Sequence, residues 1–380
     1  MSQDAQHQNG LFNQNIRIFF RDALRITLRD PSVALFVLKT IWRQRRAMVR
    51  RARWEERGVH VIPFIMASVT NRCNLRCTGC YACENIDDRG GDAEMDPGQL
   101  RSFVAQADEI GVSIILIAGG EPLVRSDLLD ITGDHPGVIF PLFTNGLLID
   151  DAVIRRLRRQ RNVVPVLSLE GRRAATDGRR GAGVYEQVLD RMQRMREAGI
   201  FFGTSLMLTR DNVDRLLDES FIRDLFELGC RIFFFVNFVP VEPGTDQLAL
   251  TPEQKRRKAE ILTDYRQRLP GLFMDFPGDE QRYGGCLAAG RGFVHISPEG
   301  HVEPCPFSPF SDSSLKDIPL IEALQSDFLR KIRESGVQEL EPESGCVLWD
   351  NRQWLTSLLE PEPVGDPEEM SVFGAIGERS

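Results

Sequence analysis

Three cysteines lie close together in the sequence at a spacing suited to an iron–sulfur cluster. Cys73, Cys77 and Cys80 form a C-x3-C-x2-C pattern. Iron–sulfur clusters are held by Cys thiolates, so three of them on one loop can bind three irons of a [4Fe–4S] cluster. The fourth iron then has no protein ligand, and an open metal position is where an exogenous molecule can bind and react. The spacing therefore predicts a reactive cluster with Cys73, Cys77 and Cys80 as its catalytic and metal-binding residues.

Two other kinds of site are weighed against this one. A structural zinc site usually has four ligands, often including His, and no His lies within ten residues of Cys73. A ferredoxin-like cluster would use Cys83 as a fourth ligand and leave an electron carrier without a substrate site. Bacterial ferredoxins have a different spacing, C-x2-C-x2-C-x3-C, and the open cluster is therefore favoured.

Apolar runs rich in Val, Ile and Phe alternate with helical patterns from residue 61 onward. Six runs predict strands, at 61–69, 113–118, 137–143, 163–169, 201–208 and 231–239. Helical patterns lie near 97–110, 125–131, 150–160, 184–198, 214–228 and 252–268. Strands that alternate with crossover helices form a parallel sheet covered by helices. Six such units are too few for a closed eight-stranded barrel, so we expect an α/β fold, a partial (β/α)6 barrel of the TIM type.

The cysteine loop directly follows the first predicted strand. In this placement, and in the residues Thr70 to Cys77 around it, the chain resembles the radical S-adenosylmethionine (SAM) enzymes, which carry a C-x3-C-x2-C loop after the first strand of a (β/α)6 partial barrel. The resemblance covers roughly residues 61–240. One position departs from the family pattern: Gly79 stands where an aromatic residue is common, and Tyr81 is expected to replace it in packing against adenine.

The resemblance implies SAM-binding residues at the C-terminal ends of the later strands, where barrel sites are built. These are the turn Gly119-Gly120-Glu121-Pro122 for the amino group, Asn145 lining the site, Ser168 and Glu170 for the ribose, and Arg180 for the carboxylate. Two assignments stay open. Glu170 is equally suited to capping the next segment, and Arg179 lies beside Arg180.

A second set of cysteines follows the predicted barrel. Cys286, Cys305 and Cys346, with Gly300 between the first two, resemble the auxiliary-cluster extension called SPASM with two clusters and twitch with one. The resemblance implies a probable auxiliary [4Fe–4S] cluster, and a hairpin with its turn at 298–300 would bring Cys286 and Cys305 together. The fourth ligand is Cys230, Cys83 or a substrate. The alternatives are buried free thiols, with His295 and His301 on the hairpin surface, or zinc.

Composition and charge divide the chain of 380 residues further. The net charge is −8, yet residues 17–57 contain twelve Lys or Arg and four Asp or Glu, a net of +8. We expect a basic amphipathic helical segment over 1–58, the barrel over 59–270, the extension over 271–358 and an acidic disordered tail over 359–380. The acidic body argues against nucleic-acid binding. Without a signal peptide or an apolar run of membrane-spanning length, a cytoplasmic location is expected.

The resemblance implies reductive cleavage of SAM at the [4Fe–4S] cluster to a 5′-deoxyadenosyl radical, which abstracts hydrogen from a substrate. A flavodoxin or ferredoxin-type donor would supply the electron. Auxiliary-cluster enzymes often modify peptides, so a peptide or protein side chain is the expected substrate. The first alternative is a lipid or membrane-associated substrate, because residues 1–57, with arginines on one helix face and Trp42 among the apolar residues, suit peripheral membrane contact. The second is a non-catalytic iron–sulfur electron carrier or scaffold.

Overall fold

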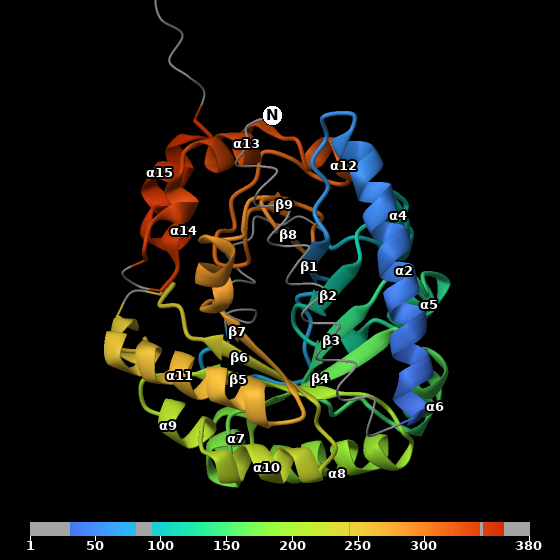
Figure 1. The fold of residues 1–380 in the computed structure, drawn as a ribbon, viewed down its shortest axis with the longest axis vertical. Coiled ribbons are helices and arrows are strands. Elements are labelled where there is room, and N and C mark those ends of the chain that lie inside the picture. The colour runs from blue at the N-terminus through green and yellow to red at the C-terminus, as the bar shows by residue number, and fades with distance from the viewer. Residues whose placement is uncertain (1–30, 81–92, 243, 343–344, 361–380) are drawn as a thin grey trace, which may run out of the picture.

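The computed structural model describes residues 31–80, 93–242, 244–342 and 345–360. Within them, nine strands form one sheet in the order β7-β6-β5-β4-β3-β2-β1-β8-β9. The strands β1 to β9 span Phe64–Ser68, Ile114–Ala118, Phe140–Thr144, Val163–Leu169, Gly203–Leu208, Ile232–Asn237, Leu272–Phe276, Phe293–Ile296 and Val302–Glu303. Strands β1 to β7 are parallel to their neighbours. The sheet curves into an open half-barrel (Figure 1), which confirms the predicted partial barrel.

Helices cover the outer face of the half-barrel (Figure 1). They are α4 Pro97–Ile110, α5 Leu128–Asp134, α6 Asp151–Arg159, α7 Arg173–Arg180, α8 Val184–Glu197, α9 Val213–Leu216, α10 Glu219–Glu227 and α11 Pro252–Arg268. Helix α4 begins with a capping box, in which Asp96 accepts from the Gln99 amide and the Gln99 side chain accepts from the Asp96 amide. Thr251 and Gln254 repeat this arrangement at α11, and both helices have Pro as their first residue. These local signals explain why both helices begin where the sequence predicts.

The sheet continues beyond the six predicted strands. Strand β7 was not predicted, and it pairs with β6 on one side of the half-barrel. Strand β8 pairs in parallel with β1, and it forms the predicted antiparallel hairpin with β9. The C-terminal extension also carries the short helices α12 Leu320–Ala323, α13 Asp327–Glu334, α14 Val347–Asp350 and α15 Arg352–Ser357. One sheet therefore runs across residue 270, where the sequence suggested a domain boundary.

Helix α2, Pro31–Glu55, packs against the N-terminal side of the half-barrel. Arg50 pairs with Asp108 of α4 at 3.0 Å, and the buried Arg51 donates to the Ser113 hydroxyl at 2.7 Å. Two arginines of the basic N-terminal segment, Arg50 and Arg51, therefore hold α2 to the barrel. Residues 1–30 of the predicted basic segment and residues 361–380 of the predicted tail lie outside the described residues. No helix of the described residues is long and apolar enough to cross a membrane, and peripheral membrane contact stays a prediction.

Candidate functional site

The three clustered cysteines lie on the loop that leaves the C-terminal end of β1. Cys73, Cys77 and Cys80 are free thiols of intermediate exposure, and all three line one cavity of about 650 Å³ inside the half-barrel. Burial raises the pKa of the Cys73 and Cys77 thiols above the ordinary value, and Arg180 and Arg179 oppose this at Cys77. Metal ligation needs thiolates, so iron binding here would release protons. The donor set and its place on a cavity wall suit a [4Fe–4S] cluster.

The Gly119–Pro122 turn after β2 packs directly beneath the cysteine loop. The Gly120 amide donates to the Thr70 carbonyl at 2.7 Å, and the Glu121 amide donates to the Arg72 carbonyl at 2.9 Å. A Cβ on Gly119 would lie 2.4 Å from the Thr70 carbonyl oxygen, and one on Gly120 would lie 2.3 Å from that of Arg72. Only glycine permits this approach of two backbones. Both glycines also line the cavity.

Glu121 lies behind the turn and is fully buried. Its carboxylate accepts hydrogen bonds from the Thr144 hydroxyl at 2.8 Å, the Asn145 amide at 2.7 Å and the Leu123 amide at 3.1 Å. Burial raises its pKa, while these bonds and Arg180 oppose the rise. Pro122 is also buried and opens the short helix η1, Pro122–Val124. Neither side chain is among those lining the cavity, so Glu121 joins the ends of β2 and β3, and the turn faces the cavity through its glycines.

Asn145, at the end of β3, connects that strand to the cysteine loop. Its side-chain amide donates to the Asn74 side chain at 2.8 Å, and its Nδ2 lies 3.9 Å from the Cys73 sulfur. It lines the cavity, as does Ser168 near the end of β4. The structure therefore brings Asn145 and Ser168 together with the cysteines, as the resemblance implied. Tyr81 lies outside the described residues.

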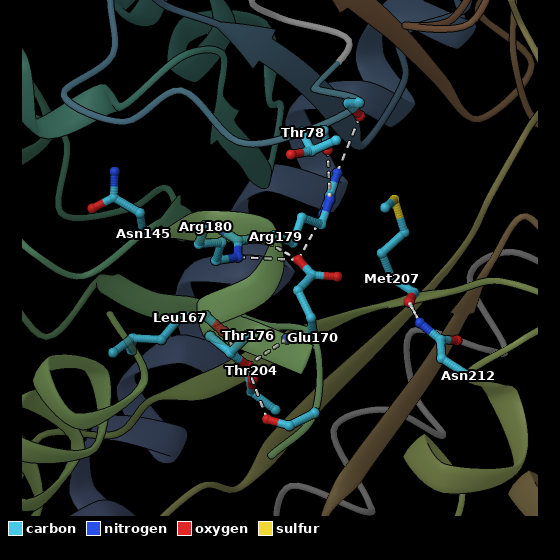
Figure 2. A network of polar contacts seen from close by, with 12 residues as sticks. Thr78, Asn145, Leu167, Glu170, Thr176, Arg179, Arg180, Thr204, Met207 and Asn212 are labelled. Carbon is cyan, nitrogen blue, oxygen red and sulfur yellow. Dashed lines mark hydrogen bonds and ion pairs between the residues drawn. The ribbon is translucent and has the colours of Figure 1, made fainter. Parts of the chain in front are cut away.

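Two arginines of α7 share one buried carboxylate, as Figure 2 shows. Arg179 Nη1 lies 2.6 Å and Arg180 Nη2 lies 2.7 Å from Glu170 Oε1. Arg179 also donates to the carbonyls of Thr78 and Gly79, at 3.1 and 3.2 Å, and its own carbonyl accepts from the Thr78 amide. These hydrogen bonds of Arg179 therefore hold the cysteine loop against α7. The Glu170 side chain holds both arginines and makes no capping bond to α7.

The second set of cysteines gathers in the extension. Cys286, Cys305 and Cys346 pack with one hydrophobic cluster, and burial raises the pKa of each, to about 12 for Cys286 and about 11 for Cys346. Cys286 and Cys346 both raise the pKa of Cys305 electrostatically, and Cys346 also raises the pKa of Cys286. Among the described residues, no group of three or more His, Cys, Asp or Glu is arranged to hold one metal ion.

Cys230 does not belong to either set. It is fully buried in a different hydrophobic cluster, with its sulfur 4.0 Å from that of Met192 on α8. It therefore lies in the core between the sheet and its helices, and its candidacy as a ligand beside Cys286 is wrong. Cys83 lies outside the described residues. The carboxylate near all three cysteines is Glu280, whose pKa burial raises to about 7 and whose charge raises the pKa of each of them.

Sequence reasoning missed two buried polar networks on the cavity. Lys258 of α11 pairs with Asp275 of β7 at 2.6 Å and bonds to the Asn237 side chain at 2.8 Å. In the other network, the Ser68 hydroxyl lies 2.9 Å from His295 Nε2, and His295 Nδ1 lies 2.6 Å from Glu303. His295 is buried, so the alternative that placed it on the hairpin surface is wrong for this residue. No local pattern marks these residues, because their partners are distant in the sequence.

Comparison with protein families decides the class. Residues 67–220 match the model of the radical SAM superfamily, a span that begins in β1 and includes the cysteine loop, the Gly119–Pro122 turn, Asn145 and the α7 arginines. Residues 67–220 of this chain therefore form a radical SAM domain. This confirms the prediction of a radical SAM enzyme that uses a [4Fe–4S] cluster and SAM.

Curated relatives of the radical SAM enzyme cover most of its length. The AdoMet-dependent heme synthase of Methanosarcina barkeri is 25% identical over 73% of this chain and 86% of its own. The mycofactocin maturase MftC of Mycolicibacterium smegmatis is 29% identical over 82% of this chain and 76% of its own. The similarity therefore extends beyond the radical SAM domain in both relatives.

Solved structures share the fold of the radical SAM enzyme. Streptococcus suis SuiB bound to its precursor peptide SuiA superposes with a TM-score of 0.60, at 19% identity, over 79% of this chain and 72% of that one. The enzyme anSMEcpe with bound AdoMet and the Cp18Cys peptide gives a TM-score of 0.57 at 18% identity, over 74% of this chain and 84% of that one. These likenesses support the half-barrel architecture.

Proposed function

We propose that this radical SAM enzyme abstracts a hydrogen atom from a peptide or protein side chain. One observation carries the proposal: the three cysteines, the two glycines of the Gly119–Pro122 turn, Asn145, Ser168 and both α7 arginines line a single cavity. When bound, the reduced cluster and SAM supply a 5′-deoxyadenosyl radical, and the protein positions the reactants and excludes water. A flavodoxin or ferredoxin-type protein supplies the electron.

The residues of the site have separate tasks. Cys73, Cys77 and Cys80 hold three irons. Gly119 and Gly120 offer backbone carbonyls to the SAM amino group, since their missing side chains let a ligand approach. Asn145 and Ser168 contribute hydrogen-bonding side chains on the cavity wall.

The two arginines differ in the groups that they contact, and this difference guides our choice between them. Arg179 bonds to the cysteine loop, so it is a positioning residue. Arg180 also lines the cavity, and its guanidinium bonds to Glu170, so we assign the SAM carboxylate to Arg180. Glu170 orients both guanidinium groups. Its ribose contact, inferred from the family pattern, would use the oxygen that the arginines do not share.

Relatives that act on peptides support a peptide substrate. SuiB was solved with the precursor peptide SuiA, and anSMEcpe was solved with the Cp18Cys peptide. MftC is a maturase. The open C-terminal edge of the half-barrel, where the cysteine loop lies, is where a peptide backbone would find hydrogen-bond partners.

Formation of 5′-deoxyadenosine tests the radical chemistry. Anaerobic, reconstituted protein reduced with dithionite should convert SAM to 5′-deoxyadenosine and methionine. Cys77→Ala should abolish this conversion and lower the bound iron, because one cluster ligand is lost. Cys230→Ala is the matched control, since Cys230 is buried away from the cavity, and it should keep both iron and conversion. Undiminished conversion by Cys77→Ala, or none by the wild type, would contradict the proposal and favour a non-catalytic carrier.

We also propose an auxiliary [4Fe–4S] cluster on Cys286, Cys305 and Cys346. The three thiols gather in one buried region beside Glu280, and this region needs an internal staple because its strands and helices are short. The wild type should then contain about eight irons per chain, and Cys305→Ala should retain about four while still cleaving SAM. About four irons in the wild type would remove the auxiliary cluster and leave the first proposal intact.

A further inference from the structure

The cavity extends well beyond the cysteine loop, through the interior of the half-barrel. At the C-terminal strand ends it is lined by the cysteines and arginines described above. At the N-terminal ends it is lined by Pro63, Ile139, Phe201 and Leu272, and helix α2 borders it there with Thr40 and Gln44. A parallel strand of five residues spans about 16 Å. The cavity therefore reaches from the SAM site through the full height of the sheet.

The inward side of the sheet is packed less tightly than the outward side. On β3 the outward Phe140 and Leu142 are 0% and 1% exposed, whereas the inward Pro141 and Phe143 are of intermediate exposure and line the cavity. Side chains alternate between the two faces of a strand, so this difference in exposure separates the inward face of β3 from its outward face. Barrel interiors are normally filled by layers of side chains. Here the space is left open, and its size is that of a ligand site.

The walls of the cavity below the strand ends are apolar. The inward residues below the strand ends are chiefly aliphatic, aromatic or Met, including Met66, Leu116, Met207 and Phe234. Polar groups are few there, and most of them have partners: Asn237 and Asp275 bond to Lys258, while Thr40 and Ser205 each add one hydroxyl to the wall. Ser68 and His295 bond to each other, and Gln44 donates to the Ser113 carbonyl at 3.2 Å.

The scarcity of hydrogen-bonding groups on the cavity wall favours a hydrocarbon chain over a peptide as its occupant. Each backbone N–H and C=O of a peptide needs a hydrogen-bond partner when it is removed from water. An amide left unpaired in such surroundings is destabilising. A peptide threaded through these walls would leave several such groups unpaired, whereas a hydrocarbon chain has none. A peptide backbone is therefore expected to stay at the polar C-terminal edge.

We propose that the barrel interior binds a long hydrocarbon chain, an acyl or isoprenoid group carried by the substrate, with the chain running from the SAM site towards α2. This proposal depends on the proposed function in one respect, namely that one end of the hydrocarbon chain lies at the SAM site. The same chemistry can come from an acylated peptide or from a free lipid. Burial of apolar surface drives the binding.

Binding of cis-parinaric acid, a fatty acid that fluoresces in apolar surroundings, tests the proposal on the intact, reconstituted protein. The wild type should bind the probe saturably, and palmitic acid should displace it. Ile114→Trp and Ile139→Trp place a large side chain in the N-terminal half of the cavity and should each weaken binding about tenfold or more, or about 1.4 kcal/mol. Val49→Trp, on the exposed face of α2, is the matched control and should leave binding unchanged.

Molecules that compete with the probe show whether the hydrocarbon chain comes from an acylated peptide or from a free lipid. Displacement by N-palmitoyl-glycylglycine at a much lower concentration than by palmitic acid indicates an acylated peptide, and displacement by both at similar concentrations indicates that the hydrocarbon chain alone suffices. Either result supports the proposal. Circular dichroism and iron content confirm that each variant is folded and loaded.

Three results would overturn the proposal: no saturable probe binding by folded wild type, unchanged binding in both Trp variants, or equal displacement by an unacylated apolar peptide. Formation of 5′-deoxyadenosine by the same preparation keeps the two proposals separate. SAM cleavage without probe binding removes the hydrocarbon site alone. Probe binding without SAM cleavage removes the radical function alone.

Discussion

Replacing Lys258 with Met should expose the energetic cost of a buried charge at the end of β7. The side chains of Lys258 and Asp275 are 3% and 6% exposed, and their charged atoms are 2.6 Å apart. Removing one partner of a buried pair leaves the other charge without compensation, which typically costs about 3–5 kcal/mol. We therefore expect Lys258→Met to lower the free energy of unfolding by about that amount at about pH 8.

The loss should depend on pH in a definite direction. Burial raises the pKa of Asp275 from 3.8 to about 6, and Lys258 opposes the rise; Asp279 adds to it and Arg266 opposes it. A carboxyl whose pKa is raised on folding contributes stability below its unfolded pKa, and loses that contribution as the pH rises through its folded pKa. The difference between 3.8 and about 6 corresponds to about 3 kcal/mol. Without Lys258 the pKa should rise further, so the variant's loss should be small at about pH 5 and full at about pH 8.

Urea unfolding under anaerobic conditions, followed by far-UV circular dichroism, measures both effects. Lys258→Met/Asp275→Asn removes both charges and should recover most of the loss at about pH 8. Arg256→Met, at an exposed position of the same helix, is the matched control and should change stability by less than about 0.5 kcal/mol. An equal loss at both pH values, or a double variant no more stable than Lys258→Met, would refute the reasoning.

Other predictions concern the contacts around the cysteine loop and the hairpin. Arg179→Gln should speed the loss of iron to a chelator about tenfold, because the loop loses its bonds at Thr78 and Gly79; Arg173→Gln on the same helix is exposed and should match the wild type. Gly119→Ala should lower both stability, by about 2 kcal/mol or more, and iron content, since its Cβ would meet the Thr70 carbonyl at φ +125°; Gly178→Ala, where a Cβ meets nothing within 4 Å, is the control. Glu303→Leu should cost about 1–3 kcal/mol in urea unfolding, because it leaves His295 Nδ1 buried without its partner, and an unchanged midpoint would contradict this account.

The sequence was informative wherever the signal was local. The six predicted strands all exist, with ends shifted by a few residues, because short continuous apolar runs rich in Val, Ile and Phe favour buried strands. Helices α4 and α11 begin and end at the predicted residues, since Asp96 and Thr251 satisfy their own first-turn amides. The cysteine spacing predicted an open iron–sulfur cluster because the three ligands share one loop, and the resemblance carried by that loop indicated the radical SAM class.

What the sequence by itself determined is therefore the class of chemistry, the half-barrel and the loop that carries the first cysteines. Only the tertiary structure decided which side chains from distant parts of the sequence contact one another in the half-barrel. It added β7 and β8 to the sheet, separated Cys230 from the other cysteines, gave Arg179 to the cysteine loop and paired Lys258 with Asp275. The open apolar interior is likewise a property of all the strands together. Contacts between residues far apart in the chain depend on packing and burial, and no short-range pattern encodes them.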